Sequence, residues 1–439
     1  MNRSAAQAWV VGLGTAVVPL DTAVNIAFPA ITRGFALATA DIQWVVICYV
    51  LTYSALTLAL GRIGDIYGHA RVFRAGLIWS TLALALCTMA PTFATLLVAR
   101  FLQGISAALI LSCGPALTIA AYGEIRRSRA LGFYTMMFAA ASTLGPWIGG
   151  ALVEAWDWPA VFAFRVPVAA LALLLSWRLP APQPAAREPF DFFGAVLLAA
   201  ALIAMLLTFN RIGELVAAPL GLVAVAAFAA FFRHEARCKN PIIDPSVFRL
   251  PGFAVLNLAN VLINLAAFSV LLLVPFYLTR ATDLPLAASG AILATGSLGM
   301  AVASPIAGRL AGRIPAARLV LTGAVLIGLG LLLIATWQRG TPAAWLVATL
   351  LLHGVGLGVF QLGYIDIVTA TIPPQHRGVA GSLAMVTRTV GTVSAAALVM
   401  LLFARLEAGS DFLSAFRESF ALAGIVPLTM AALLALRTK

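Results

Sequence analysis

Fourteen apolar runs, each about long enough to cross a bilayer, constrain this chain more than any other feature. A helix that crosses the hydrocarbon core needs about 20 mostly apolar residues. The runs lie at about residues 7–31, 43–61, 72–90, 94–120, 130–153, 159–177, 192–210, 215–232, 252–276, 286–308, 317–336, 341–368, 378–403 and 418–436. Charged residues make up 10% of the chain, against roughly 25% in soluble domains. We therefore predict an all-α polytopic membrane protein with fourteen spans.

The net charge of +12 is explained by where the basic residues fall along these spans. If the N-terminus is cytoplasmic, the loops and tails on that side hold 19 of the 28 Lys and Arg residues, and the outer loops hold 6. Cytoplasmic loops carry such an excess in membrane proteins. Both termini are therefore predicted to be cytoplasmic, and the charge does not indicate a nucleic-acid partner.

The seventh and eighth runs divide the chain into two similar halves. They are flanked by stretches rich in proline and charge, at 180–191 and 233–249. We predict an N-terminal six-helix bundle (1–178), a two-helix insert with its linkers (179–249) and a C-terminal six-helix bundle (250–439). Only residues 211–214 separate the two inserted runs, so a hairpin that enters and leaves the bilayer on one side is the alternative for this pair.

A glycine-rich loop occurs at the same place in each half. The first copy runs from Gly61 to Arg71, and a weaker copy runs from Gly308 to Arg318. Glycine permits a tight turn, and an acid such as Asp65 suits the positive end of the helix that follows. Internal repeats of this kind are typical of secondary transporters.

Four motifs make the chain resemble the major facilitator superfamily, and in particular its fourteen-helix drug:proton antiporter branch. The first loop is similar to that family's cytoplasmic gating signature, with Gly61, Asp65, Gly68 and Arg71 in place. The other three are Leu20–Pro29 in the first span, Leu97–Gly104 in the fourth, and the fifth-helix antiporter motif that contains Gly145, Pro146, Gly149 and Gly150. The resemblance implies two six-helix bundles around a central cavity, alternating access, and a monomer in a bacterial cytoplasmic membrane that could work with accessory export proteins.

The sequence departs from this pattern in two places. His69 and Ala70 stand where the gating signature usually has basic residues. At the start of the sixth span Trp158, Phe162 and Pro167 match the branch, but Arg165 replaces an expected asparagine. The substitution weakens the expectation of an ordinary cationic drug as substrate.

Three charged residues fall deep inside predicted spans, where an ionisable side chain is costly without a partner. Asp21 lies roughly 20 Å above the cytoplasmic end of its helix and Arg100 roughly 9 Å below the outer end of its own. These levels coincide in a core of about 30 Å. Asp21 and Arg100 are therefore the candidate proton-coupling pair, because a carboxylate that gains and loses a cationic partner changes its proton affinity. A static ion pair is the alternative. Arg165 could contact an anion or pair with Glu154 or Asp157.

Uncharged polar residues in the first, ninth and twelfth spans are the candidates for the lining of the cavity. Asn25 follows Asp21 by four residues, and Asn257, Asn260 and Asn264 share one face of the ninth span. Interhelical hydrogen bonds are the alternative role for these amides. His353, Gln361 and Arg388 complete the candidate set. Asp366 is expected to face water or to pair with Arg377.

The glycines and proline of the fifth-helix motif are expected to seal and pivot the two bundles, because small residues let helices approach closely.

No sequence pattern supports catalysis, ATP use or a metal. Cys48, Cys87, Cys113 and Cys238 have no CxxC or metal-ligand spacing, and no glycine loop precedes a lysine. We therefore expect a transporter rather than an enzyme, without cofactors and driven by the proton gradient. The first hypothesis is proton-coupled export of small organic, amphipathic compounds. The second is proton-linked uptake, or facilitated transport, of a nutrient or an organic anion. A membrane sensor would need an extra domain for which the chain has no room.

Overall fold

The computed structural model describes residues 3–37, 42–179, 190–211, 214–239, 241–242, 245–284, 286–311, 313–373 and 376–437. Most of the predicted linker at 180–191 lies outside this part of the chain. The described residues are almost entirely helical, as a bilayer requires, because a helix satisfies its backbone hydrogen bonds internally.

The helices of the N-terminal half and the insert follow the apolar runs closely, with two interruptions. They are α1 (Arg3–Ala16), η1 (Pro19–Thr22), α2 (Ala23–Gly34), α3 (Gln43–Tyr67), α4 (His69–Thr88), α5 (Phe93–Tyr122), η2 (Glu124–Arg126), α6 (Arg127–Trp156), α7 (Ala160–Ala163), α8 (Arg165–Ser176), α9 (Phe192–Asn210) and α10 (Ala217–Glu235). The predicted first span changes to a 3-10 turn at Pro19–Thr22. The predicted sixth span is divided only at Phe164, whose φ of −63° and ψ of −24° are still helical.

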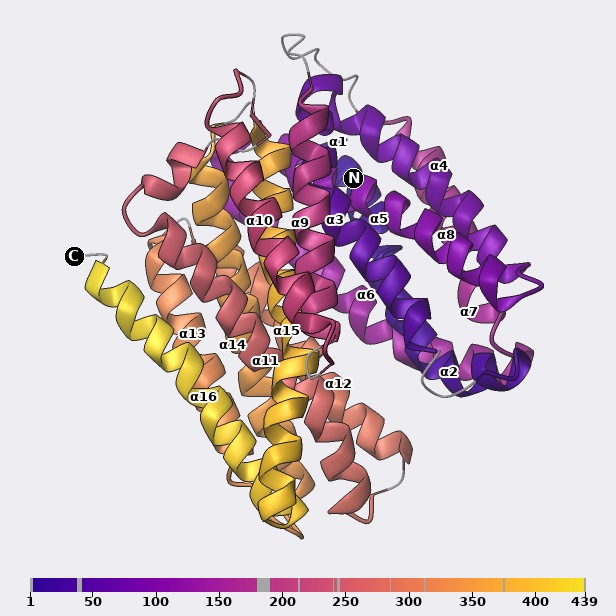
Figure 1. The fold of residues 1–439 in the computed structure, drawn as a ribbon, viewed down its shortest axis with the longest axis vertical. Coiled ribbons are helices and arrows are strands. Elements are labelled where there is room, and N and C mark those ends of the chain that lie inside the picture. Colours follow the sequence, from indigo (N-terminus) through magenta and orange to yellow (C-terminus); the bar gives the residue numbers. More distant parts are fainter. Residues whose placement is uncertain are drawn as a thin grey trace. The chain divides into compact units, whose positions relative to one another are not determined.

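The C-terminal half forms one short 3-10 helix and six α-helices of 19 to 33 residues in its described part. They are η3 (Pro245–Arg249), α11 (Phe253–Arg280), α12 (Leu286–Leu310), α13 (Ala316–Ile334), α14 (Ala343–Thr371), α15 (Arg377–Gly409) and α16 (Phe412–Arg437). Figure 1 shows this half in orange to yellow and the N-terminal half in indigo to magenta.

Twelve helices in the described part of the chain are long and apolar enough to cross a membrane. The sixth and seventh predicted spans are helical as well, but they fall below that length as the shorter apolar stretches Ala160–Ser176 and Phe192–Met205. The structure therefore supports twelve of the fourteen predicted spans.

The chain folds into two compact units. The first consists of residues 1–203, 226–244 and 372–385, and the second of residues 204–225, 245–371 and 386–439. The first unit includes a short segment from the C-terminal half, because the beginning of α15 packs with the N-terminal helices. The inserted pair α9 and α10 is shared between the two units.

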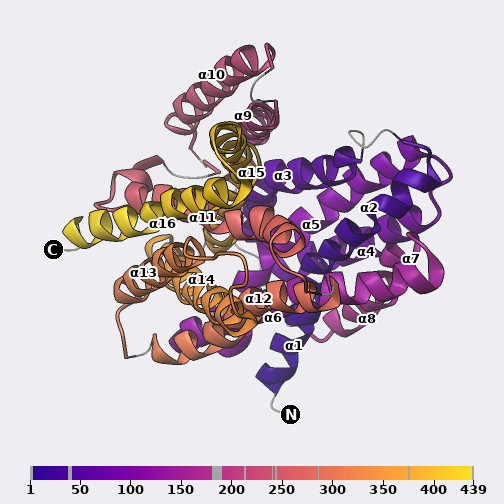
Figure 2. The ribbon, with the colours of Figure 1, turned by 90° about the horizontal axis from the view of Figure 1, so that it is seen from below.

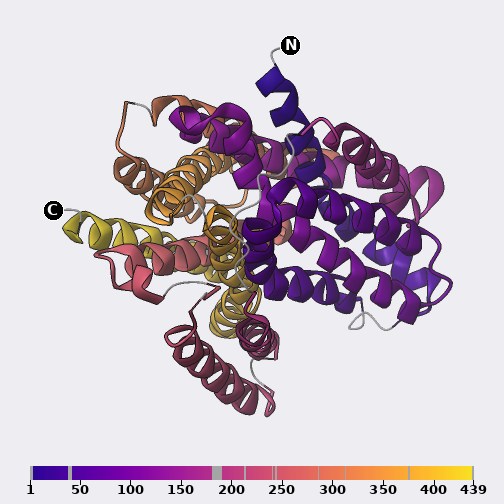
Figure 3. The ribbon, with the colours of Figure 1, turned by 90° about the horizontal axis from the view of Figure 1, so that it is seen from above.

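Within the first unit, α5 is the central helix. It packs against α1, α3, α4 and α6, and α4 also packs against α8, as seen in Figure 2. In the second unit α14 packs against α12 and α13, and α16 against α11 and α13; Figure 3 shows this group from the other side.

One expectation about the gating loop is wrong. Helix α3 continues to Tyr67 and α4 begins at His69, so Asp65 lies in the last turn of α3 and not at the start of the next helix. Gly68, with a φ of 93°, forms the turn alone. This φ is open to glycine at no steric cost, and the turn is therefore tighter than the sequence predicts.

Candidate functional site

A buried charged cluster forms between η1, α5 and α8, the elements that carry Asp21, Arg100 and Arg165. The side chain of Arg100 on α5 donates from Nη1 to Oδ1 of Asp21 and from Nη2 to Oδ2, both at 2.7 Å. Its Nε donates to the carbonyl oxygen of Val45 at 2.8 Å. Gln103, one turn further along α5, donates to Oδ1 of Asp21 at 3.0 Å and accepts from Arg100 at 2.6 Å. The pairing expected from the depths of Asp21 and Arg100 is present, and the structure shows that it is bidentate.

Arg165 is the second cation on the same carboxylate. Its Nη1 donates to Oδ1 of Asp21 at 2.7 Å, and its Nε donates to the carbonyl oxygen of Val161 at 3.2 Å. The partner is therefore Asp21, and the proposed pairing with Glu154 or Asp157 is wrong. Arg165 is the first residue of α8, and its side chain reaches Asp21 in the 3-10 turn of the first span.

The cluster carries an excess of positive charge in a nearly dry site. The side chains of Arg100 and Arg165 are fully buried, and that of Asp21 is 13% exposed. With Asp21 ionised, two guanidinium groups face one carboxylate. Nη2 of Arg165 and the hydroxyl of Tyr49 have no hydrogen-bond partner among the described residues. The Tyr49 ring lies 4.3 Å from the Arg100 guanidinium, a cation–π contact that partly offsets the charge.

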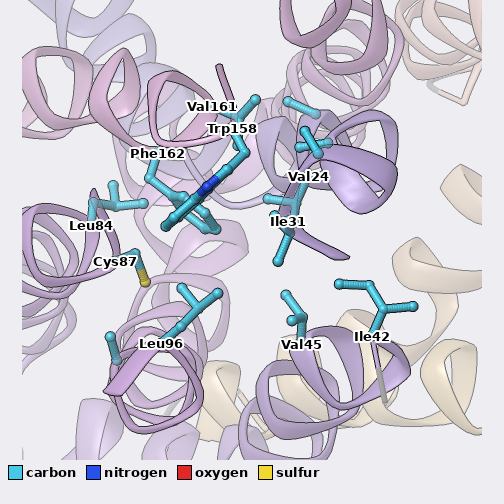
Figure 4. Close-up of a cluster of buried hydrophobic side chains, with 14 of the residues drawn as sticks. Val24, Ile31, Ile42, Val45, Leu84, Cys87, Leu96, Trp158, Val161 and Phe162 are labelled. Atoms are coloured by element: carbon cyan, nitrogen blue, oxygen red, sulfur yellow. The ribbon is translucent and has the colours of Figure 1, made fainter. Parts of the chain in front are cut away.

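Apolar clusters enclose the charges along the helices. One contains Val24, Val45 and Phe162, and it is drawn in Figure 4 with Trp158 near its centre. The other contains Val18, Tyr49 and Ala107. Asp21 lies between Val18 of one cluster and Val24 of the other. The low polarity on both sides strengthens its pairing with Arg100.

The three asparagines of the predicted cavity stripe form a second network, inside the second unit. Asn264 donates to Oδ1 of Asn260 at 2.8 Å, and Gln361 on α14 donates to Oδ1 of Asn264 at 2.9 Å. Tyr364 donates to Oδ1 of Asn257 at 2.9 Å. All of these side chains are buried. The network ties α11 to α14 by the interhelical hydrogen bonds that were the alternative role, and contact with a substrate stays a prediction.

The remaining cavity candidates differ in how far their side chains are buried. His353 is 5% exposed, and its Nε2 has no hydrogen-bond partner among the described residues. Arg388 is half-buried, and Asn25 is exposed although Asp21, one turn away, is largely buried.

Asp366 is 5% exposed, so the expectation that it faces water is wrong. The side chain of Arg377, its other expected partner, lies outside the described part of the chain.

The gating-loop residues contact the segment of the C-terminal half that belongs to the first unit. Oδ2 of Asp65 accepts from the backbone N–H of Val379 at 3.3 Å, in the first turn of α15, and Oδ1 lies 3.3 Å from Nε2 of His69. Arg62 contacts His376. Asp65 therefore does sit at the positive end of a helix, but that helix is α15. Arg71 is exposed and Gly61 is buried within α3.

The fifth-helix motif packs against the first span within the first unit. A Cβ at Gly149 would lie 2.9 Å from the Cα, Cβ and carbonyl oxygen of Ala23, and a Cβ at Gly145 would come still closer to the Thr22 hydroxyl. A Cβ at Gly150 would only reach a methyl carbon of Ile26, at 4.0 Å, and Pro146 lies within α6. Close packing is thus observed, and a role as pivot between bundles stays a prediction.

Sequence reasoning missed three partners in these networks. Gln103 belongs to the fourth-helix motif, and its spacing of three residues from Arg100 was a usable signal. Tyr49 and Tyr364 had no signal, because one tyrosine in an apolar helix resembles any other aromatic core residue.

Comparisons with known proteins agree with this architecture. Residues 11–234 and 256–439 match the Major Facilitator Superfamily. The riboflavin transporter RibZ of Clostridioides difficile is 28% identical over 407 residues, 91% of this chain and 89% of that protein. The multidrug resistance protein Stp of Mycobacterium tuberculosis is 30% identical over 90% of this chain and 75% of its own length.

Two further likenesses point the same way. The tetracenomycin C resistance and export protein of Streptomyces glaucescens is 32% identical over 90% of this chain and 75% of its own length. The human organic anion transporter MFSD10 shares the fold, with a TM-score of 0.70 at 18% identity over 99% of this chain and 100% of that one. The chain therefore belongs to the Major Facilitator Superfamily and is a multi-pass membrane transporter of small molecules rather than an enzyme.

Proposed function

We propose that this transporter exports small organic, amphipathic compounds in exchange for protons, with Asp21 as the coupling carboxylate. One observation carries the proposal: a single buried carboxylate holds the guanidinium groups of Arg100 and Arg165 together, at 2.7 Å from each. The names of the resistance proteins from Mycobacterium tuberculosis and Streptomyces glaucescens support export over uptake.

The coupling step follows from the charge balance of the cluster. A proton on Asp21 would remove the negative charge that holds the two cations, and mutual repulsion would then favour their separation. Asp21 lies in the short 3-10 turn Pro19–Thr22 of the first span, where irregular helix geometry is typical of ion sites in transporters. Binding of a proton from outside would thus favour substrate release, and its loss to the cytoplasm would reset the cluster.

Proton coupling is tested in proteoliposomes that report substrate-induced proton movement. We expect Asp21→Asn to abolish coupled transport, and the matched change Asp283→Asn, at an exposed loop carboxylate, to leave it unchanged. Coupled transport by Asp21→Asn at the wild-type rate would overturn the assignment of Asp21.

A second candidate is transport of an organic anion, by proton-linked uptake or facilitated diffusion. The excess positive charge of the cluster and the unpartnered Nη2 of Arg165 favour it. The name of the Clostridioides difficile relative, a riboflavin transporter, agrees with a role in nutrient transport. Flux measured in everted vesicles with one anionic and one cationic probe separates the two candidates, because export loads everted vesicles and uptake does not.

The topology that we propose has fourteen spans, both termini in the cytoplasm and a monomer in the bacterial cytoplasmic membrane. The number of spans depends on α9 and α10, because the described apolar part of α9, Phe192–Met205, is shorter than a membrane span. Leu215 is 99% exposed between them. If both helices cross, Leu215→Cys will react with an impermeant maleimide from outside intact cells, whereas the parent protein will not. Labelling in everted vesicles alone would instead indicate the hairpin.

A further inference from the structure

The two ends of the inserted helix pair meet in a cluster of potential metal ligands. Asp191 immediately precedes α9, and His234 lies in the last turn of α10. Cys238 lies one turn further on, in a turn that continues the helix, since its backbone N–H donates to the carbonyl oxygen of His234 at 3.0 Å. Residues four apart share a helical face. His234 and Cys238 therefore present their side chains together.

The donor atoms of these three residues converge. One ligand atom from each lies within 4.8 Å of the other two, and no other group of three such residues in the described part of the chain does so. Nε2 of His234 lies 2.8 Å from Oδ2 and 3.0 Å from Oδ1 of Asp191. All three side chains are half-buried, whereas the basic residues around them, Arg233, Arg237 and Lys239, are exposed.

The surroundings orient the Asp191 carboxylate and bring a second carboxylate near it. The backbone N–H of Gly194 donates to Oδ1 of Asp191 at 2.9 Å, which is the kind of outer hydrogen bond that fixes a metal-binding carboxylate. A Cβ atom at Gly194 would lie 2.5 Å from Oε1 of Glu235, and it would also collide with Asp191. Only glycine at position 194 thus lets the Asp191 and Glu235 carboxylates approach the same point of the backbone.

The donor set selects among metal ions. Calcium and magnesium take oxygen ligands almost exclusively, whereas zinc accepts one sulfur, one imidazole nitrogen and carboxylate oxygen together. Tetrahedral zinc, with bonds of about 2.0–2.3 Å, places its ligand atoms roughly 3.3–3.7 Å apart. The Asp191–His234 contact would lengthen by about half an ångström as Nε2 gave up its proton, and the sulfur, within 4.8 Å of both partners, would approach by at most about 1 Å. Both changes are within the range of side-chain rotation.

We propose that Asp191, His234 and Cys238 form a zinc site that clamps the base of the inserted helix pair. The fourth position would be taken by Glu235 or by water. Metal binding would close a loop between residues 43 apart, Asp191 and His234, and would stabilise the hairpin by mass action, because the unfolded chain does not present the three ligands together.

Zinc content of the purified full-length protein tests the site. The protein is stripped with a chelator, given Zn²⁺ and desalted, and the metal is counted per chain. The variants are His234→Ala, Cys238→Ser and, as the matched control, Cys48→Ser, a half-buried cysteine outside the cluster. We expect about one Zn²⁺ in the wild type and in Cys48→Ser, and at least about tenfold weaker binding in the other two.

Cobalt gives a readout that does not depend on transport or on every variant being equally stable. Co²⁺ bound to a cysteine thiolate adds a near-ultraviolet charge-transfer absorption, which we expect in the wild type and in Cys48→Ser and not in Cys238→Ser. No stoichiometric Zn²⁺ in the wild type, or equal cobalt spectra in Cys48→Ser and Cys238→Ser, would overturn the proposal and leave an ordinary hydrogen bond between His234 and Asp191.

Discussion

Replacing Gly149 by alanine should loosen the packing that holds the Asp21 segment in place. Gly149 lies on α6, and an ideal Cβ there would be 2.9 Å from the Cα, Cβ and carbonyl oxygen of Ala23. Two of those atoms belong to the backbone, so no rotamer change relieves the overlap. The next residue, Gly150, is a matched control, because its Cβ would meet only a methyl carbon of Ile26, at 4.0 Å.

The magnitude follows from the difference between the two glycines. Ordinary contacts between carbon atoms are about 3.5–4.0 Å, so α6 and α2 would have to separate by at least about 0.6 Å at Gly149. Overpacking of this kind costs about 1–3 kcal/mol. Both substitutions gain up to about 1 kcal/mol of helix propensity, which cancels in the comparison. We therefore expect Gly149→Ala to be about 1–3 kcal/mol less stable than Gly150→Ala.

Unfolding by a denaturing detergent, followed by tryptophan fluorescence, measures the difference in the free energy of unfolding. Ala23 is two residues from Asp21, so a displaced α2 should also lengthen the 2.7 Å contact between Asp21 and Arg100. We expect lower transport in Gly149→Ala and wild-type transport in Gly150→Ala. Equal stability and equal transport in the two variants would refute the packing argument.

Three further substitutions probe the turn and the two networks. Arg100→Lys keeps the charge but not the bidentate geometry, and should lower stability by about 1.5–3 kcal/mol, with the exposed Arg71→Lys as control in the same unfolding assay. Gly68→Ala, at a φ of 93°, should lower the free energy of unfolding by about 1–2 kcal/mol. Gly290→Ala, where a Cβ meets nothing within 4 Å, should not lower it, and equal melting temperatures of the two variants would contradict this. Gln361→Ala leaves buried amide oxygens of Asn260 and Asn264 with fewer donors and should cost about 1–3 kcal/mol, whereas Asn25→Ala should stay within about 0.5 kcal/mol.

Much of the site could be located from the sequence because depth in a bilayer is a one-dimensional quantity. Counting residues from the helix ends placed Asp21 and Arg100 at one level, and they are in contact. The same counting placed Arg165 near that level but could not say which way its side chain points. Its partner was consequently missed in favour of two acids nearby in the sequence.

The asparagine stripe shows the same boundary between periodicity and packing. Helical spacing correctly put Asn257, Asn260 and Asn264 on one face, and that face is buried. Periodicity does not tell whether a polar face meets a water-filled cavity or a neighbouring helix. Here Gln361 and Tyr364 of α14 pack against the asparagine face. Whether they do so depends on how α14 is rotated about its own axis, which the sequence does not show.

By itself, the sequence determined that the chain is a helical membrane protein, where its helices lie and which charged residues are buried in them. These are local properties, because the bilayer imposes a fixed apolar length and leaves backbone groups no partner but the helix itself. The tertiary structure decided which groups meet. Asp21 and Arg165 are 144 residues apart, Asp191 and His234 are 43 apart, and Asp65 and Val379 are 314 apart. Such contacts depend on how helices bend, rotate and pack, and side-chain spacing along one helix carries no information about that.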